Sequence, residues 1–235
     1  MADSTRTIVA PVAEQELGTL GLQLEHVEAR LAEMGEQGIL SITVLQREGR
    51  QVEDGWEDYD KTLKCIAEFL ADYQRSRMRD DDLLIEAVIE GNSFVLFISP
   101  PRSGRSLDLV DLTRVRHRLS KSLQRHLLRS MPRSAVQQFG VYVGGSLVRY
   151  DPTVDCKRII HRSLDAAFAD ALSQKRAETR RLSLHLNRIL QSGRLSSVYQ
   201  PVVDLQRREV VGFEALTRVS TAHFPTPDLL FRVAN

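Results

Sequence analysis

Two apolar runs near the end of the sequence constrain the fold more strongly than any other feature of this chain. Residues 198–205 and 210–216 are apolar over most of their length, and a polar segment at residues 206–209 separates them. This pattern predicts a β-hairpin. The second strand carries a carboxylate, Glu214, near its end, and Arg218 follows it. Because carboxylates bind divalent metals and arginines bind phosphates, we expect polar chemistry at this strand end.

Upstream of the hairpin, helical and strand patterns alternate. The hydrophobic spacing predicts helices over residues 12–35, 56–77, 107–130 and 155–191, and strands over residues 39–45, 83–89, 94–99 and 138–148. The order α β α β β α β α predicts an α/β (α+β) domain in which helices flank a mixed sheet. A glycine and an asparagine at residues 90–93 predict a tight turn between the two central strands.

The first predicted helix has two interpretations. Its apolar residues have the spacing of the a/d seam of a two-stranded coiled coil: Leu17, Leu20, Leu24, Val27, Leu31 and Met34. One interpretation is a homodimer that forms through this N-terminal helix. The other is a helix that packs on its own domain.

Composition excludes several functional classes. Hydrophobic residues make up 42% of the chain and the net charge is +1, so global charge favours neither nucleic acid nor a membrane surface. No apolar run approaches the ~20 residues of a transmembrane helix, and the first residues lack the layout of a signal peptide. Cys65 and Cys156 have no metal-ligand spacing and suit a reducing compartment. We therefore expect a cytoplasmic protein with no membrane span and no nucleic-acid partner.

The hairpin sequence resembles the start of a known family. The segments YQPVVDL (residues 199–205) and VVGFEALTR (residues 210–218) are similar to the opening of EAL domains, the phosphodiesterases that linearise cyclic di-GMP. The resemblance implies a metal ligand at Glu214 and a phosphate contact at Arg218. It also implies that Gln200 contacts the bound dinucleotide and that Leu216 packs beneath a guanine or ribose.

This resemblance covers about residues 182–235, the opening of a TIM-type barrel of about 250 residues. Hydrolysis of a phosphodiester needs several oxygen ligands, usually two metals, and a base that activates water. We expect the other ligands on later strands, so this chain holds a truncated start of the EAL barrel and no catalytic residue. Mg²⁺ or Mn²⁺ is expected only in the complete EAL domain.

Residues 36–174 resemble a GGDEF domain, the diguanylate cyclase fold that commonly precedes EAL domains. The family's hairpin motif, Gly-Gly-Asp-Glu-Phe, stands here as Glu90-Gly91-Asn92-Ser93-Phe94, and only the second glycine and the phenylalanine match. HRSLDAAFADAL (residues 161–172) resembles the family's closing helix, and GVYVGGSLVRYDP (residues 140–152) resembles the strand before that helix.

The departures from this motif remove groups that a cyclase needs. Asn92 and Ser93 replace the acidic pair that would hold a divalent ion, and Glu90 replaces a glycine where a phosphate must approach the backbone. Residues 45–48 follow the first predicted strand, and only Glu48 among them is acidic. We therefore expect no cyclase activity, and the lost charges also argue against GTP binding.

Two weaker signals each have two interpretations. Arg79 and Asp82 fit the family's product-inhibition motif, Arg-x-x-Asp, but lie farther from Glu90 than in the family, and we favour a polar loop. Nine Lys or Arg residues between positions 102 and 133 give the third predicted helix a basic face. One interpretation of this face is a binding surface for an anionic partner, and the other is a solvated helix face. The lack of interleaved aromatic residues favours the solvated face.

These patterns predict four segments: an N-terminal tail and signalling helix (1–35), a degenerate GGDEF-like domain (36–174), a connecting helix (175–192) and the truncated start of an EAL domain (193–235). The functional hypothesis is an inactive, regulatory GGDEF-like domain of a cyclic di-GMP signalling protein whose parent carries an EAL phosphodiesterase. The alternative is a non-enzymatic cyclic di-GMP effector or an interaction scaffold.

Overall fold

A computed structural model describes residues 20–47, 55–87, 93–219, 221, 224 and 227–234. Contacts within the chain divide it into two compact units. The first comprises Met1–Gln46 and Val52–Ser173, and the second comprises Arg47–Gln51 and Gln174–Asn235. Helix α5 (Cys156–Gln191) is one continuous helix and contributes residues to both units.

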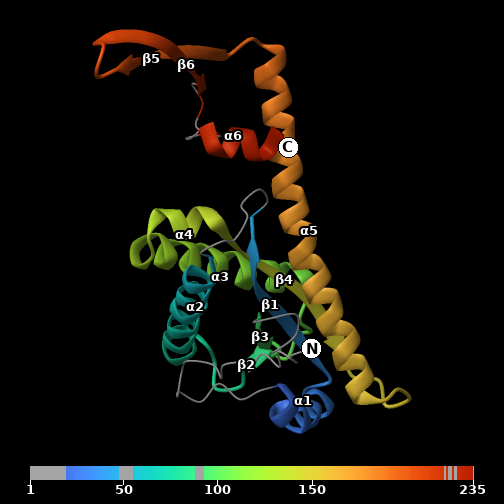
Figure 1. Ribbon diagram of the computed structural model, residues 1–235. Coiled ribbons are helices and arrows are strands. Elements are labelled where there is room, and N and C mark those ends of the chain that lie inside the picture. Colours follow the sequence, from blue (N-terminus) through green and yellow to red (C-terminus); the bar gives the residue numbers. More distant parts are fainter. Residues whose placement is uncertain are drawn as a thin grey trace, which may run out of the picture. The chain divides into compact units, whose positions relative to one another are not determined.

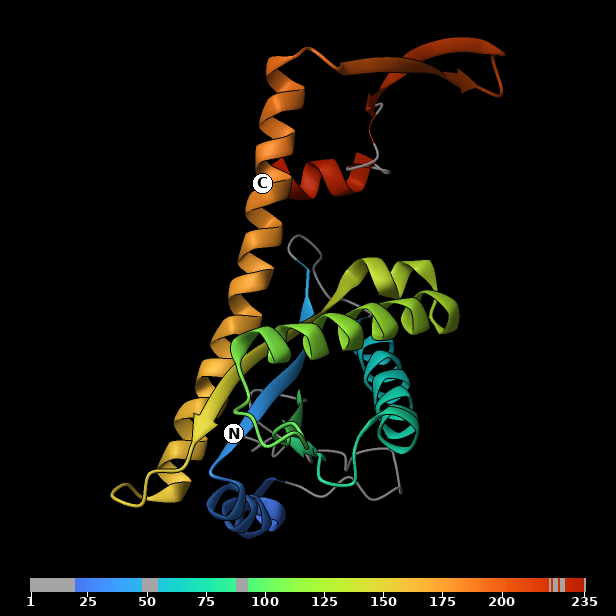
Figure 2. The ribbon, with the colours of Figure 1, turned by 180° about the vertical axis from the view of Figure 1, so that it is seen from behind.

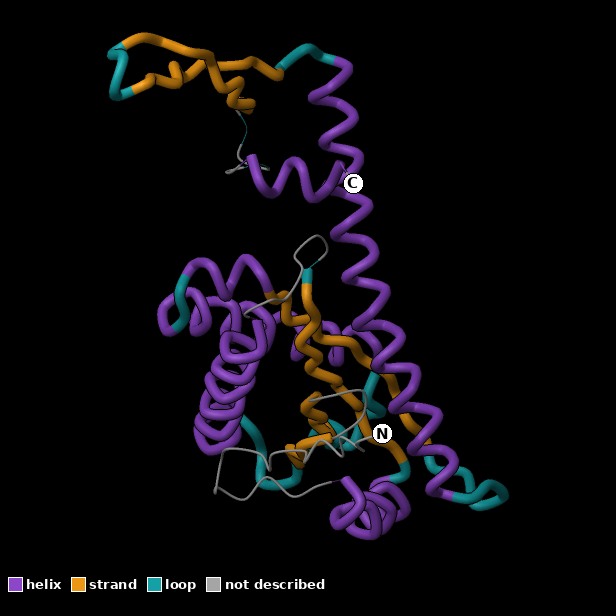
Figure 3. Tube along the Cα trace, in the orientation of Figure 1, coloured by secondary structure: helices purple, strands orange, loops and turns teal. Residues whose placement is uncertain are grey.

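The first unit is built on a four-stranded sheet (Figures 1 and 3). The strand order is β2-β3-β1-β4, and every pair among the described residues is antiparallel. The strands are β1 (Glu36–Gln46), β2 (Leu83–Ala87), β3 (Ser93–Ile98) and β4 (Phe139–Arg149). Helices α1 (Leu20–Met34), α2 (Gly55–Arg77), α3 (Leu109–Ser130), α4 (Arg133–Gln138) and the first part of α5 complete the unit, and Figure 2 shows it from behind.

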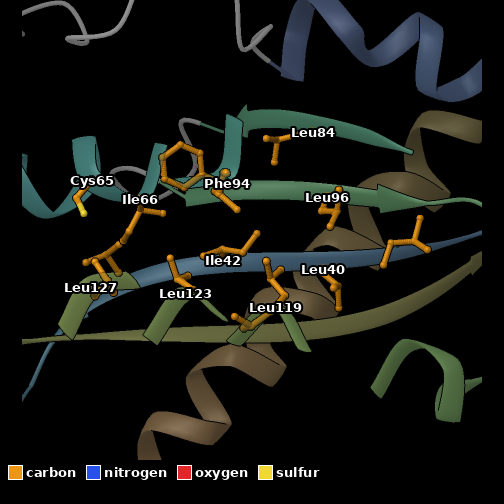
Figure 4. Close-up of a cluster of buried hydrophobic side chains, with 14 of the residues drawn as sticks. Leu40, Ile42, Cys65, Ile66, Leu84, Phe94, Leu96, Leu119, Leu123 and Leu127 are labelled. Atoms are coloured by element: carbon orange, nitrogen blue, oxygen red, sulfur yellow. The ribbon is translucent and has the colours of Figure 1, made fainter. Parts of the chain in front are cut away.

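One face of this sheet packs against α2 and α3 (Figure 4). Because side chains alternate between the two faces of a strand, β1 and β3 supply every second residue to this cluster. The cluster includes Leu40, Ile42, Phe94 and Leu96 from the strands, Ile66 from α2, and Leu119, Leu123 and Leu127 from α3.

The opposite face of the sheet packs against α1 and α5. The alternate residues of the same strands supply this second cluster, which includes Ile39, Val95, Phe97, Ile160 and Leu164. Helices therefore cover both faces, and the predicted α/β class with a helix-flanked sheet is confirmed. The sheet was predicted to be mixed, but every described strand pair in it is antiparallel. Predicted strand residues 88–89 lie outside the described part of the chain.

Helix α1 uses its heptad seam inside its own unit. Val27 and Leu31 are fully buried against the sheet, and Leu24 packs at the edge of the same cluster. Arg30 also bonds to Asp81, with 3.2 Å between the guanidinium and the carboxylate. These contacts favour the interpretation of a helix packed on its own domain. Leu24 and Met34 of the seam are half-buried, and Leu17 lies outside the described residues.

Helix α5 approaches β4 at a glycine. The carboxylate of Asp170 accepts hydrogen bonds from the backbone N–H of Gly145 (2.9 Å) and from Arg116 of α3 (2.8 Å). The Ser41 hydroxyl of β1 donates to the carbonyl of Ala167 at 2.9 Å. A side chain at Gly144 would collide with the backbone of this helix. Helix α5 is therefore held on the sheet by polar bonds as well as by apolar packing.

The second unit contains the predicted hairpin. Strands β5 (Leu195–Asp204) and β6 (Glu209–Val219) pair in antiparallel register, which confirms the hairpin. The carboxylate of Asp204 organises the turn, because it accepts the backbone N–H groups of Gln206 and Arg207 at 2.8 and 3.1 Å. A small cluster joins α6 (Pro227–Ala234) to the end of α5 through Leu186, Ile189, Phe224 and Leu230.

Two short helices, α4 and α6, are absent from the sequence-based prediction. Helix α4 has six residues and α6 has eight, so neither gives a long periodic pattern. Pro227 at the first position of α6 is a helix-start signal, because proline has no N–H to leave unbonded there.

Candidate functional site

The position where the resemblance to GGDEF domains places a metal site is occupied by uncharged side chains. Ser93, the first residue of β3, is paired with Thr43 of β1. Ser93 is only 1% exposed, and Phe94 beside it belongs to the apolar core with 2% exposure. Glu90, Gly91 and Asn92 of the motif lie outside the described residues. Within the described chain, this strand end therefore presents two hydroxyl groups and no carboxylate.

Strand β1 runs farther than predicted. The strand was predicted over residues 39–45, but it spans Glu36–Gln46, and its last residue, Gln46, pairs with Phe139 of β4. The longer strand reflects continuous pairing with the eleven-residue β4, which is a non-local interaction. Glu48 lies outside the described residues.

The first residue after β1 is a cation. Arg47 donates from Nη1 to Oε1 of Glu178 at 2.8 Å, and both residues belong to the second unit. In the described residues, no group of three or more His, Cys, Asp or Glu side chains could hold a metal ion.

Thr43 is the residue of this site that the sequence patterns did not reveal. Its hydroxyl oxygen is buried and has no hydrogen-bond partner within the described chain. It is the β1 residue paired with Ser93, whereas the resemblance points to a ligand after the strand. The alternation of β1 was visible in the sequence, but its register with β3 was not.

Arg79 and Asp82 form the connection between α2 and β2. The two oxygens of Asp82 accept the backbone N–H groups of Arg79 (3.1 Å) and Ser99 (2.9 Å). The Arg79 guanidinium donates to the carbonyl of Pro100 at 3.1 Å. These bonds fasten the loop to the end of β3, which supports the interpretation of a polar structural loop.

The four residues singled out in the hairpin lie on one face of β5 and β6. Gln200 is directly paired with Glu214, Val198 with Leu216, and Ser196 with Arg218. Directly paired residues share a face of a sheet, and so do residues two apart on one strand. Gln200, Glu214, Leu216 and Arg218 are therefore aligned, and this alignment follows from the predicted hairpin once its register is known.

This face is exposed and offers a partial set of ligands. Glu214 and Gln200 are exposed, and Leu216 is half-buried. Their side-chain oxygens are suitable for Mg²⁺ or Mn²⁺. However, one carboxylate and one amide do not complete a metal site, so the described residues alone do not fit a catalytic metal centre.

Both faces of the hairpin expose apolar side chains. Tyr199 and Phe213 are 65% and 66% exposed on the face opposite Leu216. Val198 and Val202 are each 49% exposed on the same face as Leu216. Strands that are apolar on both faces are typical of sheets covered on both sides. Within the hairpin, β5 and β6 pair with each other from Leu195↔Val219 to Asp204↔Glu209.

Neither cysteine has the features of a reactive thiol. Burial, and then the charge of Glu68, raise the pKa of Cys65. Burial, and then Glu28 and Asp155, raise the pKa of Cys156. A raised pKa lowers the fraction of thiolate at neutral pH, so both residues suit structural roles.

Comparisons with known proteins give structural neighbours only. No protein-family model matches the chain, and no curated protein matches it. Diguanylate cyclase SiaD from Pseudomonas aeruginosa, in complex with its activator SiaC, has a TM-score of 0.45 and 18% identity over 68% of this chain and 56% of its own. The S helix-GGDEF-EAL portion of Vibrio cholerae LapD, bound to c-di-GMP, has a TM-score of 0.41 and 13% identity over 92% of this chain.

This chain spans 51% of that LapD chain. The GGDEF domain of TpbB, also called YfiN, from Pseudomonas aeruginosa has a TM-score of 0.41 and 13% identity over 68% of this chain and 88% of its own. Because every one of these TM-scores is below 0.5, the function proposed next rests on the residues of this chain. In the described residues, no helix has the length and apolar character needed to cross a membrane.

Proposed function

We propose that the first unit is a catalytically inactive, regulatory GGDEF-like domain and that the second unit begins an EAL phosphodiesterase domain for cyclic di-GMP. The observation that carries the proposal is the alignment of Gln200, Glu214, Leu216 and Arg218 on one face of a hairpin. A carboxylate, an amide, an apolar side chain and a guanidinium on one face suit a metal-bound phosphodiester and a base stacked beside it.

Inactivity of the first unit is supported by Thr43 and Ser93. Two-metal phosphoryl chemistry requires carboxylates that neutralise and hold the ions. The paired strand ends offer hydroxyl groups there, and Asn92 adds no charge. A domain without turnover that precedes an EAL domain is suited to control it, and both would act in the cytoplasm.

The exposed apolar hairpin supports the barrel assignment. In a TIM-type barrel, both faces of each strand are covered, by the barrel interior and by the outer helices. Further strands past residue 235 would cover Phe213 and Val202, and would supply the missing oxygen ligands.

The test is hydrolysis of cyclic di-GMP by a polypeptide that continues past residue 235 with the complete barrel, in Mg²⁺ or Mn²⁺. We expect the linear dinucleotide as product, and its loss in Glu214→Ala. Glu209→Ala, at the turn end of the same strand, is the matched control and should retain activity. Cyclic di-GMP binding without hydrolysis would instead favour a non-enzymatic effector.

A further inference from the structure

Helix α3 of the first unit presents a basic surface that the proposed function does not use. The helix contains six Lys or Arg residues and one acid, Asp111. Arg116 is bonded to Asp170, and Asp111 pairs with Arg105 at 2.6 Å and more distantly with Arg114 at 3.8 Å. Within the described chain, Arg118, Lys121 and Arg129 have no ion-pair partner. The face therefore carries uncompensated positive charge.

This face also exposes apolar side chains at its N-terminal end. Leu109 is 64% exposed and Val110 is 56% exposed. Together with Thr113, Arg114, His117 and Arg118 they line a shallow hollow of about 670 Å³. The hollow thus combines an apolar floor with two guanidinium groups, and the described residues that line it all belong to α3.

The surface is preformed. Helix α3 begins with a capping box, in which Asp108 accepts the backbone N–H of Asp111 at 2.7 Å and Asp111 accepts the N–H of Asp108. The opposite face is anchored in the core by Leu112, Leu119, Leu123 and Leu127. The outward residues are consequently held on a rigid helix, which lowers the entropic cost of binding.

We propose that this hollow is a docking site for an acidic amphipathic helix of a partner protein. One apolar side chain of the partner fills the hollow over Leu109 and Val110, and carboxylates one turn away pair with Arg114 and Arg118. Carboxylates at i, i+4 spacing match cations at the same spacing on α3. Guanidinium groups also bind carboxylates in two-pronged geometry, which a lysine surface cannot do.

The composition argues against two other anionic occupants. Bilayer-binding helices commonly carry aromatic residues among their apolar side chains, whereas α3 has no aromatic residue except histidine. Single-stranded nucleic acid binding uses aromatic platforms interleaved with the charges, and these are missing from α3.

The test uses a fluorescein-labelled synthetic helix with leucines and glutamates at i, i+4 spacing as the probe. The comparison probe has glutamine at every glutamate position. We expect the full 235-residue chain to raise the anisotropy of the acidic probe, and to bind it at least about tenfold more tightly than the glutamine probe. Equal binding of the two probes, or no binding of the acidic one, would overturn the proposal.

Three variants localise the binding. Arg114→Gln with Arg118→Gln should weaken it about tenfold, because two charge pairs are removed. Val110→Ala should weaken it about threefold through the lost apolar contact, while alanine maintains the helix. Arg180→Gln with Arg181→Gln, an exposed pair on α5, removes the same charge elsewhere and should change binding less than about twofold.

Equal loss in the α3 and α5 charge variants would show general attraction instead of docking, and would contradict the proposal. Circular dichroism of each variant establishes that α3 is intact.

Flotation with vesicles of phosphatidylglycerol and phosphatidylcholine tests whether the surface binds a bilayer. Vesicle binding that depends on Arg114 and Arg118, with no binding of the acidic helix, would assign the surface to lipid and overturn the proposal. The result is independent of cyclic di-GMP hydrolysis.

Discussion

The α-carbon of Gly144 in β4 lies so close to Ala167 of α5 that a Cβ atom built on it would be 1.9 Å from the carbonyl oxygen of Ala167. The obstacle is helix backbone, which has no rotamer that could move aside. Gly144→Ala should therefore lower the free energy of unfolding by more than about 3 kcal/mol, beyond the usual cost of overpacking. Urea unfolding measures the change. Gly212→Ala, where nothing lies within 4 Å, should shift stability by less than about 0.5 kcal/mol.

The carboxylate of Asp170 ties α5 to two neighbours at once. Asp170→Ala leaves the Gly145 N–H and the Arg116 guanidinium without their acceptor, and should cost about 1–3 kcal/mol. Asp72→Ala is the contrasting variant, because the pair of Asp72 with Arg75 is exposed and should contribute less than about 1 kcal/mol. Similar losses in the two variants would show that the bond network adds nothing beyond a surface pair.

Restoring acidic residues to the hairpin motif should not produce a cyclase. In Asn92→Asp with Ser93→Glu, the new glutamate must enter a position that is 1% exposed and lies beside Thr43. Burial of a carboxylate there should destabilise the fold by several kcal/mol. Ser134→Glu, an exposed position in the first turn of α4, should be nearly neutral. Formation of cyclic di-GMP from GTP and Mg²⁺ by the double variant would contradict this account of the site.

Acid should weaken the N-terminal end of α3. The hydrogen bond from Arg105, assisted by the backbone N–H of Asp108, lowers the pKa of Asp111. A carboxyl with a lower pKa in the folded state contributes stability above its unfolded pKa, and loses it as the pH falls through the folded value. The thermal midpoint should therefore decline between about pH 5 and pH 2. Asp111→Asn should show a shallower decline over that range, and an identical slope would refute the assignment.

The hairpin should be the least protected sheet in this 235-residue chain. Strands β5 and β6 form a two-stranded sheet with exposed apolar side chains, and such sheets are marginally stable alone. Backbone amides of β5 and β6 should exchange with deuterium at least about 100-fold faster than those of β1. Equal protection would mean that the hairpin needs no further strands, which would weaken the barrel assignment.

Local patterns predicted most of this fold, and non-local pairing supplied what they missed. The alternation within β1 and the spacing within α3 identify their buried faces, because these signals are contained in each segment. The position of Thr43 beside Ser93 depends on the register of β1 with β3, which no short segment encodes. The apolar spacing of α1 is equally typical of a coiled coil and of a helix that packs on its own domain. The burial of Val27 and Leu31 against the sheet, which is a tertiary contact, favours the second interpretation.

The strand order has a consequence for how the chain is made. The central strand β1 is apolar on both faces, and its partner β4 lies about 100 residues later in the chain. At a synthesis rate of about 5–20 residues per second, β4 is therefore made about 5–20 seconds after β1. Strand β3 arrives earlier and covers one edge of β1. During this interval the other edge of β1 is exposed on the ribosome, and the nascent chain is a natural client for chaperones that bind extended apolar segments.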